Sequence, residues 1–173
     1  MRSFNPTALI GRALPQIELA ATTGGSVDLS LLDTPRSIIY CYPRTSVPGQ
    51  PAPSDWDMIP GSRGCTPQAC TFRDHHKELA ERQAQVFGLS TQSTGYQQEM
   101  AERLHLPFAV LSDEQFKLID ALDLPTSEAD GMRLIERLTL IVRRAAVEAV
   151  LYPVREPERS AAEVIAWLDA HPL

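Results

Sequence analysis

Five short segments of strand composition run through this chain, with stretches of helical periodicity between them. Residues 37–42 form an almost continuous apolar run that ends at Pro43, which is typical of a central strand covered on both faces. The other strand candidates are residues 85–90, 106–111, 137–142 and 146–151, and the last two are expected to pair with each other. Because strands and helices alternate, the sequence predicts an α/β fold in which helices flank a central sheet.

Capping residues and paired charges mark three of the predicted helices. Glu99 and Arg103 have the spacing of an i,i+4 ion pair in a helix over residues 96–104. Asp113 and Ser160 are each placed to cap a further helix, and the one after Ser160 is amphipathic.

The N-terminal part of the chain has the pattern of a β-hairpin. Residues 16–20 and 27–29 are short strand candidates on either side of the turn at Gly24-Gly25, and Asp28 or Ser30 can cap a brief helical turn. Later in the chain, Pro107 favours an edge position for the strand at residues 106–111, because proline cannot donate to a strand ladder.

Composition limits the class of protein. The 173 residues suffice for one domain, residues 1–173, and the net charge of −6 argues against nonspecific binding to nucleic acid or anionic membranes. No apolar run near the N-terminus has the length of a signal peptide or membrane span, so we expect a cytoplasmic protein. In that compartment a close cysteine pair is more typical of redox chemistry than of a structural disulfide.

The segment at residues 60–74 carries this cysteine pair. A glycine-containing loop leads to Cys65, Thr66 can cap a helix, and Pro67 fits the first turn of that helix, which the spacing extends to about residue 85. Cys65 would then lie where backbone N–H groups lack partners and the helix dipole is positive. A thiol of ordinary pKa is only ~3% ionised at pH 7, so a nucleophilic cysteine also needs a cation or further donors.

The second cysteine of the pair, Cys70, lies five residues after Cys65. In an ideal helix their Cα atoms would be roughly 8.7 Å apart, whereas a disulfide needs less than about 7 Å. The two sulfurs can therefore bond only if the helix unwinds locally. The third cysteine, Cys41, lies within the central-strand run and is expected to belong to the core.

A proline-rich segment at residues 44–59 separates the central strand from the cysteine loop. Its prolines predict a loop rather than a domain boundary, and loops of this length beside a reactive residue often act as lids. Trp56 in this loop could cover the thiol or simply anchor the loop on the core.

Several of these motifs together resemble a peroxiredoxin, most closely of the peroxiredoxin Q or bacterioferritin comigratory protein branch. The resemblance covers most of the chain and rests on the following residues: Tyr42-Pro43 at a strand end, Ser62 three residues before Cys65, Gly64-Cys65-Thr66 followed by Cys70, Phe72-Arg73-Asp74, Leu106-Pro107-Phe108 with Leu111-Ser112-Asp113, and Arg137 opening a later strand.

The resemblance implies a thioredoxin-like fold with a central mixed sheet. It also implies a thiol-dependent reduction of hydrogen peroxide and organic hydroperoxides. It further implies recycling by a thioredoxin- or glutaredoxin-type reductant, no metal or other cofactor, and a monomer or homodimer. A thiol–disulfide oxidoreductase of the same fold is the main alternative, although that class normally carries Cys-x-x-Cys. A metal-binding or interaction protein that keeps the fold is a third possibility.

The resemblance also assigns roles to individual residues. Cys65 would be the peroxidatic cysteine, with Ser62 donating a hydrogen bond to the peroxide. Arg137 would supply the cation that the thiolate needs. Cys70 would resolve the oxidised Cys65 by forming a disulfide with it, although the sequence leaves Cys41 open as a rival.

The chain departs from the family pattern before the reactive cysteine. The family has proline seven residues ahead of that cysteine, whereas Met58 occupies the position here. Pro43 is our candidate for the shielding proline, which requires the segment at 44–59 to loop out, and Pro60 is its rival. His75-His76 could suggest a metal site with the cysteines, but the two side chains would face different directions and the spacing fits no structural zinc pattern.

Overall fold

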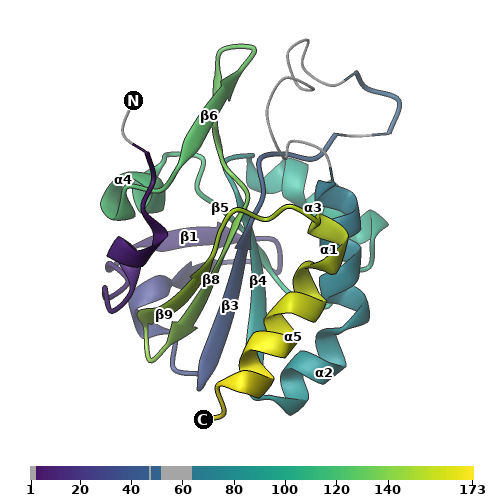
Figure 1. The fold of residues 1–173 in the computed structure, drawn as a ribbon. Coiled ribbons are helices and arrows are strands. Elements are labelled where there is room, and N and C mark those ends of the chain that lie inside the picture. The colour runs from purple at the N-terminus through teal and green to yellow at the C-terminus, as the bar shows by residue number, and fades with distance from the viewer. Residues whose placement is uncertain (1–2, 47, 52–63) are drawn as a thin grey trace.

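A seven-stranded mixed sheet forms the centre of the computed structural model, which describes residues 3–46, 48–51 and 64–173 (Figure 1). The strand order is β2-β1-β5-β4-β3-β8-β9. The strands of this sheet are β1 (Glu18–Ala21), β2 (Ser26–Asp28), β3 (Arg36–Cys41), β4 (Ala84–Ser90), β5 (Val110–Ser112), β8 (Leu138–Arg143) and β9 (Ala146–Leu151).

Strands β3, β4 and β5 are parallel to one another, whereas β8 joins β3 and β1 joins β5 in antiparallel pairs. The helices are α1 (Cys65–Asp74), α2 (His76–Glu81), α3 (Thr94–Arg103), α4 (Lys117–Leu122) and α5 (Ser160–Ala170), and short 3-10 turns are η1 (Pro6–Leu9), η2 (Leu29–Leu31) and η4 (Pro157–Arg159). The expected α/β fold with a mixed sheet, flanking helices and an N-terminal hairpin is confirmed.

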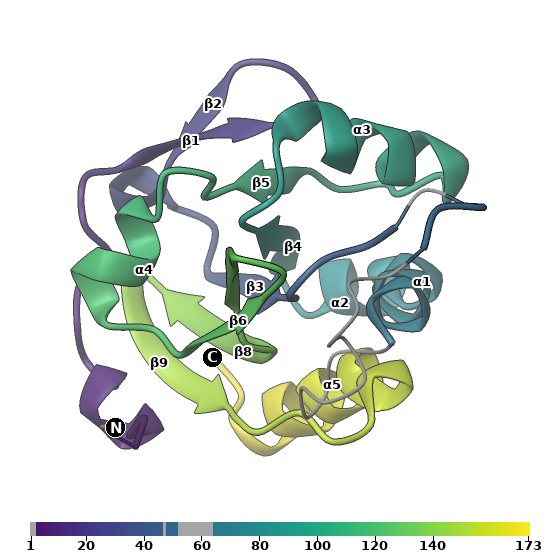
Figure 2. The same cartoon turned by 90° about the horizontal axis from the view of Figure 1, so that it is seen from above.

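The helices lie on both sides of the sheet. We call the side covered by α1, α2, α3 and α5 the α1 side, and the opposite one, covered by α4 and η1, the α4 side (Figure 2). Side chains alternate along a strand, so Ile38 and Tyr40 of β3 pack on the α1 side while Ile39 and Cys41 pack on the α4 side. Every residue of β3 is buried, as its apolar run predicts.

Four local predictions are confirmed. Glu99 Oε1 accepts a hydrogen bond from Arg103 Nε at 2.8 Å within α3. Asp28 caps η2, with its Oδ1 2.9 Å from the N–H of Ser30. The Asp113 carboxylate accepts from the backbone N–H groups of the first turns of α4, and β9 pairs with β8.

The cysteine helix is shorter than its spacing predicts. It begins at Cys65 with Gly64 as N-cap, so Thr66 is inside the helix and does not cap it. The helix stops at Asp74 and a second one, α2, starts at His76. At the break, the Nδ1 of His75 lies 2.8 Å from the carbonyl oxygen of Thr71, where an imidazole N–H competes with the helical hydrogen-bond ladder.

Two other predictions are wrong. The strand expected at residues 106–111 is only Val110–Ser112, and it lies between β1 and β4, so it is no edge. Pro107 lies outside the strand and costs the ladder nothing. Ser160 is the first residue of α5 and not its cap, because its side chain turns into the core.

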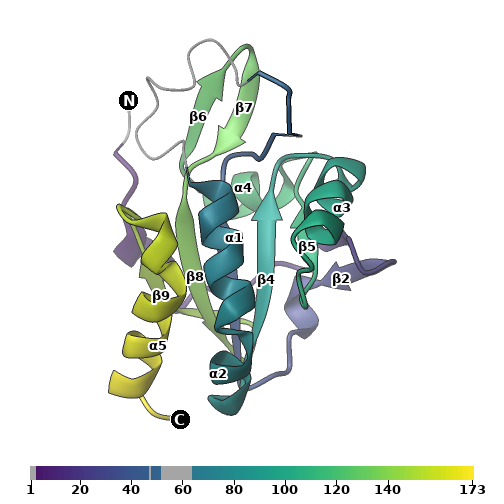
Figure 3. The same ribbon diagram turned by 90° about the vertical axis from the view of Figure 1, so that its right-hand side faces the viewer.

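A second hairpin was not predicted. Strands β6 (Thr126–Ala129) and β7 (Met132–Ile135) pair antiparallel and project beyond the end of the main sheet (Figure 3). Asp130 and Gly131 join them, both with positive φ (48° and 74°). Asp-Gly is a strong hairpin signal, but the preceding strand, Thr126–Ala129, is too polar to indicate a strand from the sequence.

The described part of the segment at 44–59 leaves β3 and is attached beside α3. The side-chain amide of Gln92 brackets Thr45, accepting from its N–H at 2.9 Å and donating to its carbonyl at 2.8 Å. Tyr96 Oη donates to Gln50 Oε1 at 3.0 Å.

Within the described residues, none of the helices is long and apolar enough to cross a membrane.

Candidate active site

The thiol of Cys65 lies at the first residue of α1, against the sheet, and is 5% exposed. The helix begins there because Gly64 adopts φ 102°, ψ 11°, a left-handed conformation that favours glycine. At the first residue of the helix, Cys65 is at the positive end of the helix dipole. This is the position that the local sequence predicted.

Arg137 reaches this thiol from 72 residues away in the sequence. It directly precedes β8 and is 4% exposed, and its Nη2 donates to the Sγ of Cys65 at 3.1 Å. Antiparallel pairing of β8 with β3 sets Leu138 opposite Cys41, which brings the preceding arginine to the same end of the sheet as α1. The structure thus joins the two residues that we singled out as nucleophile and cation.

Two further residues of this site were not identified from the sequence. Gln68 is fully buried, and its Oε1 accepts from Arg137 Nη1 at 2.5 Å. The Nε2 of Gln68 donates to the Oγ of Ser160 at 3.1 Å. Gln68 lies three residues after Cys65 and so on the same helix face, which was the available signal; nothing local distinguished Ser160.

The second and third cysteines lie on opposite sides of the sheet. Cys70 is partly buried in the second turn of α1 and packs with the core on the α1 side, as Cys65 does. Cys41 is fully buried in the core of the α4 side. Burial, with a smaller contribution from the Asp113 carboxylate, raises the pKa of the Cys41 thiol far above its usual range. The structure therefore separates Cys41 from the other two thiols by the sheet itself.

Aromatic side chains pack in the core between α1 and the sheet. The Tyr40 ring stacks on Phe72 with centroids 4.4 Å apart and meets Phe108 edge-on at 5.8 Å. Desolvation by burial raises the pKa of both Tyr40 and Tyr42, so these phenols stay protonated and neutral near pH 7. Phe72 follows Cys70 by two residues, so this stack also anchors the C-terminal half of α1.

Pro43 is buried two residues after the end of β3, and its shielding role stays a prediction. Ser62, Met58, Pro60 and Trp56 lie outside the described residues, so their expected roles stay predictions.

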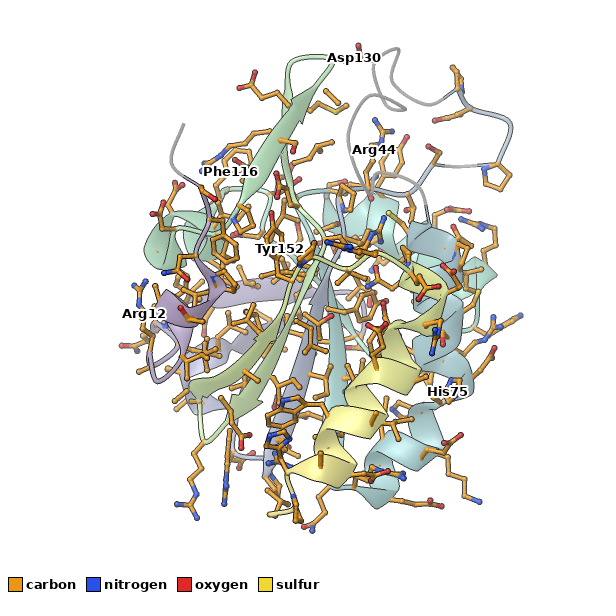
Figure 4. The ribbon with its side chains drawn as sticks, viewed as in Figure 1. Arg12, Arg44, His75, Phe116, Asp130 and Tyr152 are labelled. Carbon is orange, nitrogen blue, oxygen red and sulfur yellow. The ribbon has the colours of Figure 1, made fainter. Side chains whose placement is uncertain are left out.

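Arg137 also borders a cavity of about 490 Å³. The other residues that line this cavity are Ser127, Glu136, Tyr152, Pro153, Val154 and Arg155. Figure 4 shows Tyr152 beside the strands and the loop that precedes α5.

His75 and His76, which follow the cysteine helix, do not join the cysteines in a cluster. His75 turns its Nδ1 to the Thr71 carbonyl, and His76 lies 6.1 Å from the Phe108 ring, centroid to centroid. Among the described residues, no group of three or more His, Cys, Asp or Glu side chains could hold a metal ion.

The junction at Gly64 gives a first test of how this site is held. Replacing Gly64 with alanine is expected to lower the free energy of unfolding by about 1–3 kcal/mol, since a Cβ would sit 2.9 Å from Pro157 Cγ and the positive φ is strained for alanine. Urea unfolding measures the change. Gly95→Ala, at an open position of α3, is the control and should gain up to about 1 kcal/mol. Equal effects at the two sites would contradict the prediction.

Comparison with known protein families gives one matching family model. It is described as Redoxin and spans residues 9–165. Among curated proteins, the chain is 35% identical to peroxiredoxin Bcp of Bacillus subtilis over 117 residues, which covers 68% of this chain and 65% of that protein. It is 25% identical to the putative peroxiredoxin bcp of Coxiella burnetii over 162 residues, covering 92% and 97% of the two chains.

Solved structures show the same arrangement of elements. Peroxidoxin BcpB from Mycobacterium tuberculosis superimposes with a TM-score of 0.76 at 26% identity, covering 95% of this chain and 98% of that one. Peroxiredoxin Q of Xanthomonas campestris gives a TM-score of 0.72 at 23% identity over 96% and 94% of the two chains, a likeness of fold.

Proposed function

The chain belongs to the Redoxin family, on the branch of the Bcp and peroxiredoxin Q thiol peroxidases, and from this premise we propose that it reduces hydroperoxides with Cys65 as the nucleophile. The observation that carries the proposal is the 3.1 Å contact between Arg137 Nη2 and Cys65 Sγ at the start of α1. A guanidinium and a helix N-terminus both favour negative charge on sulfur.

In the first step the Cys65 thiolate attacks the terminal oxygen of the hydroperoxide. A new S–O bond forms and the O–O bond breaks, so sulfur loses two electrons and becomes a sulfenic acid. The released alkoxide or hydroxide takes up a proton and leaves as alcohol or water. Arg137 stabilises the thiolate before attack and the charge that develops on the leaving oxygen, and Ser62 supplies a further donor.

In the second step the Cys70 thiol attacks the sulfenic sulfur. A Cys65–Cys70 disulfide forms and water leaves. The geometry of α1 keeps the two residues apart while the helix is intact, so its first turns unwind for this step. The alternative partner, Cys41, is disfavoured because it lies on the other side of the sheet and its thiol is hard to ionise.

Return to the dithiol takes two electrons from a thioredoxin- or glutaredoxin-type reductant, whose own dithiol becomes a disulfide. The relatives supply this part of the proposal through their family, since no described residue identifies the donor. Action in the cytoplasm and assembly as a monomer or homodimer complete the proposal.

One experiment tests both steps. Reduced protein is mixed with one equivalent of hydrogen peroxide, and intact mass and peptide maps are recorded over time. We expect a rapid loss of about two mass units, mapped to a Cys65–Cys70 link. A Cys41–Cys65 link would contradict the second step, and lasting addition of oxygen to Cys65 would contradict it too. No reaction over many minutes would leave thiol–disulfide exchange as the better function.

A further inference from the structure

A buried row of polar side chains connects the C-terminal helix to the reactive thiol. Ser160 Oγ accepts from Gln68 Nε2, Gln68 Oε1 accepts from Arg137 Nη1, and Arg137 Nη2 donates to Cys65 Sγ. Ser160, Gln68 and Arg137 are each at most 4% exposed. Buried hydrogen bonds of this kind fix side-chain orientation, because a broken one leaves an unpaired polar group in the core.

The side-chain amide of Gln68 is held at both ends. With its Nε2 fixed by Ser160, its Oε1 is aimed at one guanidinium nitrogen of Arg137, which leaves the other nitrogen directed at the thiol. Without Ser160 the amide could rotate about its last torsion, a broad and soft degree of freedom. The hydroxyl on α5 therefore acts on Cys65 through two intermediates and touches no reacting atom.

The same glutamine lies inside the segment that has to unwind. It is three residues after Cys65 and two before Cys70, so a change of backbone there carries its side chain away from Ser160 and Arg137. A second contact joins the start of α1 to the segment that leads into α5. Gly64 meets Pro157 of η4 so closely that a Cβ on residue 64 would not fit. The segment 157–160 thus packs on the first turns of α1 at two points, one apolar and one polar.

We propose that Ser160 is a positioning residue with two opposed effects on the proposed peroxidase cycle. Through Gln68 it holds Arg137 against Cys65, which favours the thiolate and the first oxidation. Through the same hydrogen bond it holds the first turns of α1 in helical form, which slows formation of the Cys65–Cys70 disulfide. The inference rests on the proposed function for its biological meaning, but both effects are properties of the thiols alone.

The test uses two probes that do not depend on peroxide. The first is the pH midpoint of Cys65 alkylation by iodoacetamide. A change in how easily the reagent reaches the thiol alters the alkylation rate equally at every pH and leaves this midpoint unchanged. The second is the rate of disulfide formation with diamide, which takes two electrons and two protons from the thiols and becomes a hydrazine. Ser160→Ala should raise the midpoint by at least about half a pH unit and speed the disulfide about three- to tenfold.

The matched control is Ser37→Ala. Ser37 is equally buried and its Oγ also accepts from a glutamine amide, Gln85 Nε2 at 2.8 Å, but it lies at the start of β3, away from the thiols. This control should lose similar stability in urea unfolding while leaving both thiol readouts within about twofold of the parent. Ser160→Thr, which keeps the hydroxyl, should restore both readouts toward the parent values.

Opposite signs distinguish positioning from general loosening of the fold. The proposal requires that Ser160→Ala both raises the pH midpoint of alkylation and speeds disulfide formation. If either change is missing, or if the variant matches the Ser37→Ala protein, the proposal is overturned. If the alanine protein does not fold, Gln68→Met removes the same bond from its other end and must speed the diamide reaction. Failure of the peroxidase function would appear separately, as a parent protein that reacts with diamide but not with hydrogen peroxide.

Discussion

Replacing Cys65 with serine is expected to abolish peroxide reduction, lowering the rate at least about a thousandfold, to that of protein-free buffer. A serine hydroxyl ionises far less readily than a thiol and cannot form a sulfenic acid, so the step that breaks the O–O bond is lost. The loss corresponds to about 4 kcal/mol or more of activation free energy. Peroxide consumption coupled to a dithiol reductant measures it.

Two cysteine variants provide the controls for this loss. Cys41→Ala removes a thiol from the core of the α4 side and should keep peroxide consumption near the parent rate, at some cost in stability. Cys70→Ser should allow one rapid oxidation of Cys65 but impair recycling. Normal turnover by the Cys65→Ser protein would overturn the assignment, as would loss of the first oxidation in Cys41→Ala.

Replacing Arg137 with methionine is expected to slow the first oxidation about a hundred- to a thousandfold, the usual effect of removing a donor aimed at developing charge. The variant loses the guanidinium 3.1 Å from the sulfur, so the thiolate and the leaving oxygen both lose their cation. Stopped-flow measurement of Cys65 oxidation reports the rate. Arg137→Lys should recover only part of it, because an ammonium cannot contact Cys65 and Gln68 with two forked nitrogens.

A second buried arginine makes a matched control. Arg36 is 2% exposed, binds Glu148 through two hydrogen bonds of 2.9 Å and lies over the Trp167 ring. Arg36→Met should destabilise the protein, because it removes both 2.9 Å hydrogen bonds to Glu148 and leaves that carboxylate with the longer, 4.0 Å ion pair to Arg143. The variant should nevertheless oxidise at nearly the parent rate. If both arginine variants slow the oxidation equally, the effect of Arg137 is one of folding and not of charge at the thiol.

The N-terminal end of α1 illustrates what local sequence can predict. Glycine before Cys65 and proline two residues after it indicate a helix start, and the structure has one there. The exact cap was misassigned because Thr66 and Gly64 are both acceptable caps by type. The left-handed φ of Gly64 decides between them, and the tight contact with Pro157, 93 positions later, is part of what holds it.

Strand β3 illustrates what the hydrophobic pattern of the sequence cannot determine, namely which side of the sheet each side chain faces. Residues 37–42 are apolar without alternation, so the strand was predictable but its two faces were not distinguishable. Whether Cys41 shares a side with Cys65 depends on which face α1 covers. The packing of α1 on Ile38 and Tyr40 places Cys65 and Cys70 on one side of the sheet and Cys41 on the other, which supports Cys70 as the proposed resolving residue.

The sequence by itself determined the fold class, the start of the cysteine helix and the candidate pair of Cys65 and Arg137, the last through motifs typical of a family. It did so because apolar runs, helix-start residues and such motifs are local in the chain. The contact of Arg137 with Cys65, the buried bonds of Gln68 to Arg137 and Ser160, and the exclusion of Cys41 from the α1 side were decided only by tertiary structure. Each of these depends on which strands pair and which helix covers which face, and hydrogen bonds between residues 69 or 92 positions apart leave no periodic pattern in a single sequence.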